Sequence, residues 1–200
     1  MEQKNQIYSQ KVIEFATVVA EACLFLERAS EYSKVDFISK STKIFSLLYL
    51  KTILLDDLDE ESDGFLERFV TEEDYMYVKD QIAALLGMDD SFLEVFHPDM
   101  PYSDTPIAAF ISENLADVYQ ELKDFAANFR IGEAEVMHSA LILCVETFAE
   151  HWGQKLLNAL KALHALRFDG INEEEDSGFD AKEYRKLNKS SFFDFQSDDD

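Results

Sequence analysis

Apolar residues recur at helical spacing through most of this chain and divide it into five long segments. From Val12 to Leu26 nearly every residue is apolar, and the exceptions lie three or four apart, which predicts a heavily buried helix with one narrow polar stripe. A second helix is expected to begin after Ser33 or Asp36 as N-cap and to extend to Leu55. Its core side would carry Phe37, Ser41, Ile44, Phe45, Leu48 and Leu55.

The third predicted helix begins at Thr71, because Thr71 and Asp74 have the spacing of a capping box, and ends at Gly87. It follows a stretch, residues 56–67, with seven acids and no base, which predicts a solvated loop. Residues 88–104 hold two of the three prolines and are expected to form a connection with one helical turn at 92–96.

A fourth helix is predicted from Thr105 as N-cap and Pro106 as first residue to Phe129. Its acids and Gln120 are expected to face water, whereas Ile107, Ile111, Leu115, Val118, Leu122, Phe125 and Phe129 face the core. Gly132 separates it from a fifth helix over 133–166, about 50 Å long, for which a bend is expected at Gly153. The expected core stripe of this helix is Met137, Leu141, Cys144, Phe148, Trp152, Ala159 and Leu163.

No segment shows the alternating pattern of a half-buried strand, and the short connections favour antiparallel neighbours. The sequence therefore predicts an all-α protein, built as a single up-and-down helical bundle of about five main helices. Residues 1–168 would form the bundle domain, and residues 169–200 an acidic, Phe-containing tail.

Charge narrows the range of partners. The 200 residues include 41 Asp and Glu but only 18 Lys and Arg, a net charge of −23, which excludes a general nucleic-acid binder. Seven of these net charges belong to residues 169–200, so the body is acidic as well. Apolar residues make up 47%, which excludes disorder of the whole chain. Any partner is expected to be a protein with a basic surface.

The N-terminal residues are polar and do not resemble a signal peptide, and no charge-free stretch approaches the ~20 residues needed to cross a bilayer. The two cysteines, Cys23 and Cys144, lie singly in apolar helical patterns and lack Cys-x-x-Cys spacing. They are expected to be buried free thiols in a cytoplasmic protein.

Two sequence patterns each match only part of a known metal-binding motif. Asp59, Glu61 and Asp63 match the first ligand positions of an EF-hand loop, but Val70 stands where the bidentate glutamate should be. These three acids remain the candidate metal ligands, and a solvated acidic loop is the favoured interpretation. No cofactor is expected.

Glu94 with His97, and Glu135 with His138, have the Glu-x-x-His spacing of di-iron bundles. His97 immediately precedes a proline, and Glu135 lies in the first turn of its helix, where an acid favours the helix dipole without a metal. A surface histidine near a helix start is therefore the preferred interpretation of His138.

Glu21, Glu146, Glu150 and His151 could act in acid–base chemistry if a pocket brought them together near Trp152. The sequence contains no Gly-rich phosphate loop, nucleophile elbow or His-Glu-x-x-His motif, so no catalytic residue is assigned. Separate, solvated positions for these four side chains would remove the enzyme hypothesis.

Near the C-terminus, Phe192, Phe193 and Phe195 are embedded among acids. Three aromatic rings in so polar a segment are typical of a short docking peptide, and they are the candidate interaction residues. The alternatives are that the rings fold back onto the bundle or that the terminus frays.

Several strings in this chain resemble a bacterial domain-of-unknown-function family, number five thousand and sixty-three, over roughly residues 5–168. The strings that carry the resemblance are Ile7-Tyr8-Ser9, Leu47-Leu48-Tyr49-Leu50-Lys51, Ile82-Ala83-Ala84-Leu85-Leu86-Gly87, Asp99-Met100-Pro101-Tyr102-Ser103-Asp104-Thr105-Pro106-Ile107, Glu113-Asn114-Leu115-Ala116-Asp117-Val118-Tyr119-Gln120 and His151-Trp152-Gly153-Gln154-Lys155-Leu156. The resemblance implies an all-helical, cytoplasmic bacterial protein with no established activity, and a 3′–5′ exonuclease as a genomic neighbour.

Three functions remain open. The leading one is a non-enzymatic, cytoplasmic helical protein-interaction or accessory module. The second is an acidic decoy or regulator of a nucleic-acid enzyme such as a 3′–5′ exonuclease, in which Glu113, Asp117, Glu121 and Asp124 imitate phosphates. The third is a small-molecule or metal-binding enzyme, which needs a pocket. The oligomeric state is open.

Overall fold

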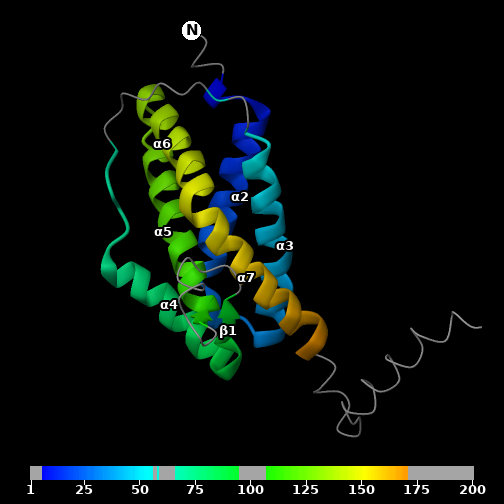
Figure 1. Cartoon of the computed structure of the whole chain (residues 1–200). Helices are drawn as coiled ribbons and strands as arrows, with labels where there is room; N and C mark the ends of the chain where they lie inside the picture. The colour runs from blue at the N-terminus through cyan, green and yellow to red at the C-terminus, as the bar shows by residue number, and fades with distance from the viewer. Residues whose placement is uncertain (1–5, 56–57, 59–65, 95–106, 171–200) are drawn as a thin grey trace, which may run out of the picture.

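The computed structural model describes residues 6–55, 58, 66–94 and 107–170, and it confirms the all-α class (Figure 1). Its α-helices are α2 (Gln10–Glu27), α3 (Lys34–Ile53), α4 (Glu72–Leu86), α5 (Ile111–Arg130), α6 (Ala134–Thr147) and α7 (Gly153–Ala165). The shorter elements are the 3₁₀ turns η1 (Ala29–Glu31) and η2 (Gly87–Asp90), the π-helical segments η4 (Phe148–Trp152) and η5 (Leu166–Gly170), and the strands β1 (Ser91–Glu94) and β2 (Ile107–Phe110).

Helix α5 is central to the bundle. It contacts α2, α4, α6 and α7, while α3 packs against α2 and α7. Helix α4 lies obliquely across the lower half of α5, rather than running along it like the other helices (Figure 1). The largest fully buried side chains come from several of these helices and form one core, and they include Phe15, Phe37, Phe45, Leu115, Leu122 and Trp152.

The predicted helix ends are confirmed where a capping side chain marks them. The Ser33 hydroxyl accepts a hydrogen bond from the Asp36 backbone N–H at 3.1 Å, and α3 begins at the next residue. Thr71 and Asp74 form the expected capping box at the start of α4. Gly87 ends α4 with φ +61°, a conformation that other residues adopt only with strain.

The connection before α5 differs from the prediction. Residues 91–94 form β1 instead of a helical turn, and β1 pairs antiparallel with β2 so that Glu94 lies opposite Ile107. The fourth predicted helix therefore begins at Ile111, not at Pro106, and two four-residue strands that no alternating pattern marked are added to the all-α fold. Thr105 and Pro106 lie outside the described residues.

Asp90 explains where α5 starts. Its carboxylate accepts from the backbone N–H of Ser112 at 2.8 Å and from the Ser112 hydroxyl at 2.6 Å, and both side chains are buried. This carboxylate satisfies an N–H in the first turn of α5, a role that the sequence pattern predicts for Thr105.

The fifth predicted helix is confirmed as the unbroken series α6, η4, α7 and η5, with its irregular segment immediately before Gly153. Within η4 the backbone departs from the α-helical ladder. The Trp152 indole Nε1 donates a hydrogen bond of 2.9 Å to the carbonyl of Cys144, eight residues earlier. A Cβ on Gly153 would lie 2.5 Å from the carbonyl oxygen of Phe148, so only glycine fits there.

Cys23 and Cys144 are buried free thiols, as predicted. Burial raises the pKa of Cys23 to about 12 and raises the pKa of Cys144 well above its usual value. Both side chains are therefore protonated at neutral pH, and the thiol is a poor nucleophile compared with the thiolate.

We expect neither cysteine of the native protein to react with a thiol-specific disulfide reagent at pH 8 on the timescale of minutes, and both to react at once in denaturant. Absorbance of the released thiolate measures the reaction. A Ser197→Cys variant supplies the control, because its added thiol should react as one equivalent while the native pair does not. Rapid release of one or two equivalents from the folded wild-type chain would contradict the burial.

None of the helices in the described ranges is long and apolar enough to span a membrane.

Candidate functional site

Two of the candidate sites fall outside the described residues. Asp59, Glu61 and Asp63 of the EF-hand-like loop belong to this group, as do Phe192, Phe193 and Phe195 of the tail. The metal and docking hypotheses for these residues therefore stay predictions. Val70, the residue that replaces the calcium-binding glutamate, donates its backbone N–H to Asp124 at 2.9 Å.

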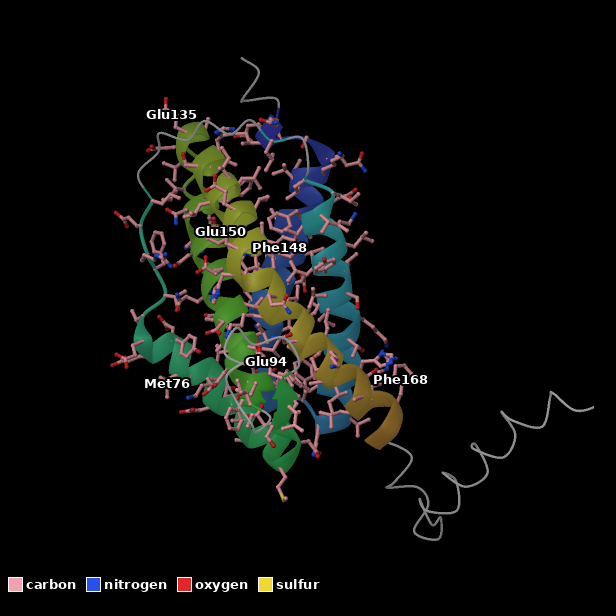
Figure 2. The ribbon with its side chains drawn as sticks, viewed as in Figure 1. Met76, Glu94, Glu135, Phe148, Glu150 and Phe168 are labelled. Atoms are coloured by element: carbon pink, nitrogen blue, oxygen red, sulfur yellow. The ribbon has the colours of Figure 1, made fainter. Side chains whose placement is uncertain are left out.

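The Glu-x-x-His motifs do not converge. Glu135 is exposed at the upper end of the bundle, whereas Glu94 lies in the lower half (Figure 2). His138 is buried, with 3% of its surface exposed, so the prediction of a surface histidine is wrong. It belongs to a run of six consecutive buried residues of α6, from Met137 to Ile142. Among the described residues, no group of three or more His, Cys, Asp and Glu side chains could hold a metal ion.

The acid–base candidates are solvated. Glu21 is exposed on α2, Glu146 is exposed on α6, and Glu150 and His151 are exposed on η4. Trp152 is buried in the core, as its place on the predicted core stripe indicated. The cavities lined by α5 do not include any of these four side chains. All four side chains are exposed, so their positions give no support to an acid–base site built from them.

The acidic row of α5 is engaged with bases of its own chain. Glu113 lies 3.8 Å from Lys79 of α4, and Asp117 lies 3.2 Å from Lys155 of α7. Glu121 and Asp124 lie 3.7 and 3.6 Å from the Arg68 guanidinium. A row of carboxylates with cations beside it imitates a phosphate backbone poorly, so this face gives the decoy hypothesis no support.

Three helices meet at Asp117. The Tyr75 hydroxyl of α4 donates to Asp117 Oδ1 at 2.9 Å, and the Lys155 ammonium of α7 lies near Oδ2. Burial, followed by the hydrogen bond to Asp117, raises the pKa of Tyr75 well above its usual value, so the phenol remains a donor. Asp117 is thereby held by one neutral and one charged donor, an arrangement that fixes α4 and α7 against α5.

A second polar contact ties β1 to α7. Glu94, at the end of β1, accepts a hydrogen bond of 2.9 Å from the Asn158 amide, and Gln154 donates to Asn158 in turn at 3.0 Å. Lys155 lies between Gln154 and Asn158 in the sequence of the same helix. The string Trp152-Gly153-Gln154-Lys155 therefore has a structural role at each position: core packing for Trp152, close approach for Gly153, a hydrogen bond within α7 for Gln154 and an ion pair with α5 for Lys155.

Residues 66–70, which we call the strap, are held against α5 by two α5 side chains. Asp124 Oδ1 accepts from the backbone N–H groups of Phe69 and Val70 at 2.7 and 2.9 Å. Asn128 accepts from the Glu67 N–H at 3.2 Å and donates to the Glu67 carbonyl at 2.8 Å. Asp124 was expected to face water, but it is buried because the strap covers it.

Three hollows lie beside α5, one of which, about 380 Å³, is lined by residues of the strap, α4 and α5 together with Glu27. A cavity of about 90 Å³ lies between the strap, α5 and α6. It has room for only a few water molecules, which is far below the size of an ordinary ligand pocket. An apolar groove of about 410 Å³ lies between α2 and α5. Alanines from both helices line it, and Lys123 at its edge is paired with Glu27 at 2.5 Å.

Replacing Asp124 by alanine is expected to lower the free energy of unfolding by about 2 kcal/mol, because two strap N–H groups lose their acceptor. Hydrogen exchange should accelerate at Phe69 and Val70 before the global transition. Asp124→Asn retains a carbonyl acceptor and should lose much less. Equal protection of these two amides in Asp124→Ala and wild type would show that Asp124 does not hold the strap.

Together, the fold and these contacts define a helical-bundle domain whose polar side chains mainly tie its own elements together. The family model of a domain of unknown function (DUF5063) matches residues 6–169, and the chain belongs to this family. The chain is also similar to protein BF1032 from Bacteroides fragilis, whose crystal structure superposes with a TM-score of 0.73 at 40% sequence identity, covering 82% of this chain and 96% of that one. Comparison with the curated proteins gave no match.

Proposed function

We propose that this protein is a non-enzymatic, cytoplasmic protein-interaction or accessory module. The observation that carries the proposal is a stripe of exposed leucines on the C-terminal half of α3 and its C-cap residue. Leu47, Leu50 and Leu54 are 43%, 48% and 41% exposed, and their spacing of three and four residues places them on one side of the helix. We call these three residues the leucine stripe.

The leucine stripe differs from scattered surface leucines, which need no explanation. Its members are successive neighbours along the helix, and Ile53, 45% exposed, extends the apolar area beside them. A contiguous apolar surface of this kind is typical of a site that binds another protein segment. The carboxylates of α5, by contrast, are engaged in contacts within the chain.

The proposed partner is a protein with a basic surface, because the chain carries a net charge of −23. The tail residues Phe192, Phe193 and Phe195 would supply apolar contacts beside the acids of the tail. In this proposal the protein binds through two elements, the leucine stripe and the tail.

Affinity capture with the full chain tests the proposal at two salt concentrations. We expect a stoichiometric partner to be recovered by the wild-type chain, and its recovery to fall in a Leu47→Ser/Leu50→Ser variant. Leu24→Ser is the matched control, since Leu24 is 45% exposed on α2, away from the stripe. A full-length variant with Phe192, Phe193 and Phe195 changed to serine tests the tail separately.

Recovery that falls in the stripe variant but not in Leu24→Ser supports a docking role for α3. Repeated captures without a stoichiometric partner would contradict the proposed function. Recovery that is equal in wild type, stripe variant and tail variant would place binding elsewhere on the protein and would also overturn the proposal as stated.

A further inference from the structure

We infer that the outer face of α3 binds the acidic, phenylalanine-containing segment 190–200 of the same chain, an inference that rests on the proposed function and deepens it by naming an occupant for the leucine stripe. The outer face consists of the leucine stripe together with Lys40 and Lys43.

Helix α3 is basic within a strongly acidic protein. It carries Lys34, Lys40, Lys43 and Lys51 but only one acid, Asp36. Lys34 pairs with Asp89, and Lys51 pairs with Glu14. The remaining two lysines are exposed on the outer face, Lys40 above the Tyr32 ring at 4.3 Å. Lys43 makes no ion pair within the described part of the chain.

The described chain also ends beside this helix. The Arg167 guanidinium donates a hydrogen bond of 2.5 Å to the Thr42 hydroxyl, next in sequence to Lys43. Phe168 is 52% exposed at the same end of the bundle, close to α3 (Figure 2). Residues beyond Gly170 therefore start next to the basic half of α3. No comparable link joins the chain end to the α2–α5 groove within the described residues.

The chemistry of the two surfaces is complementary. Segment 190–200 contains three phenylalanines and four aspartates and no base. The rings would cover the leucines, and the carboxylates would lie near Lys40 and Lys43, where opposite charges attract over roughly a Debye length of 10 Å at 0.1 M salt.

Chain length permits this contact. The 22 residues from Gly170 to Phe192 can reach at most about 70 Å, whereas α3 is about 30 Å long. Tethering through a linker of this length gives an effective concentration in the millimolar range, so even a weak contact would be populated.

Binding of segment 190–200 to α3 would have a regulatory consequence. A basic, apolar partner surface would have the same chemistry as the outer face of α3, so partner and α3 would compete for the tail. Binding of the tail within the chain would also cover the leucine stripe. Both proposed docking elements would then become available together when the segment is released.

Paramagnetic broadening in the full-length protein tests the contact. A spin label is attached at Ser197→Cys, where the buried Cys23 and Cys144 should stay unlabelled. We expect loss of amide signals along the outer face of α3 from Lys40 to Leu54, and no loss in α4. Partial recovery is expected at 1 M salt, where the Debye length is about 3 Å. Adding Leu47→Ser/Leu50→Ser should restore the α3 signals, and adding Leu24→Ser should not.

A mixture of two chains shows whether the segment that contacts α3 comes from the same chain or from a second copy. One chain carries the spin label at natural isotope abundance, and the other is isotope-labelled and has no spin label. Broadening in this mixture would show that the segment comes from a second copy and would overturn the intramolecular assignment. Broadening that is absent from α3, or that maps to the α2–α5 groove, would overturn the inference. Neither result depends on partner capture, so the proposed function succeeds or fails separately.

Discussion

Replacing Trp152 by alanine is expected to lower the free energy of unfolding by about 4 kcal/mol, twice the loss expected for Asp124→Ala. Trp152 is fully buried, and its ring packs edge-on against Phe148 with centroids 4.6 Å apart. Removing it leaves a cavity where α6, η4 and α7 meet the rest of the core. The midpoint of urea unfolding, followed by circular dichroism because this is the only tryptophan, measures the loss.

Trp152→Phe separates packing from hydrogen bonding. Phenylalanine keeps most of the apolar volume but removes the Nε1 donor to the Cys144 carbonyl. That carbonyl still accepts from the backbone N–H of Phe148, so a loss of only about 1–2 kcal/mol is expected. A Trp152→Ala protein as stable as Trp152→Phe would show that the side chain contributes little to packing.

Gly153→Ala is expected to destabilise the protein by about 2 kcal/mol, although alanine favours helix by about 1 kcal/mol over glycine. The added Cβ would lie 2.5 Å from the Phe148 carbonyl oxygen and 3.0 Å from two atoms of the Phe148 ring. Backbone cannot yield as a flexible side chain does, so the steric cost exceeds the gain in propensity. The urea midpoint of the variant, at unchanged slope, reports the balance.

Ala149→Gly is the matched control for helix propensity, because Ala149 belongs to the same π-helical segment and is not buried. It should lose up to about 1 kcal/mol without any steric change. A Gly153→Ala protein more stable than wild type would mean that propensity prevails and that Phe148 does not crowd Gly153.

Helix ends were predictable where one side chain decides them locally. Ser33, the Thr71–Asp74 pair and Gly87 mark their helix ends by chemistry confined to three or four residues, which sequence patterns capture. The long helices were predictable for a similar reason, since apolar spacing records which side faces the core.

The β1–β2 pair was not predictable because each strand has only four residues, too few for an alternating pattern to stand out. The Thr105–Pro106 pair also suggested a helix start that falls before the observed one at Ile111. The actual cap, Asp90, lies 22 residues before Ser112, and no local pattern links residues so far apart.

Within the candidate site, the main wrong prediction was that two polar residues, Asp124 and His138, would be exposed. Asp124 and His138 looked solvated because helical acids and histidines usually meet water. What covers Asp124 is a strap more than 50 residues away in the sequence, whose backbone N–H groups replace the lost water. Burial of Asp124 could have been expected only from the fact that α5 is contacted by neighbours on several sides. The sequence pattern did not show these contacts.

The π-helical segment η4 changes the direction in which side chains point along one long helix. Each residue of an α-helix turns the side-chain direction by about 100°, so a wider turn at Phe148–Trp152 rotates everything after it relative to α6. Helix α6 can thus face α5, while α7 faces both α5 and α3. The wider turn takes up the residues Phe148–Trp152 while Leu156 and Leu163 still face the core and Lys155 still lies near Asp117. The length of this segment, and not only its composition, is therefore a constraint on the sequence.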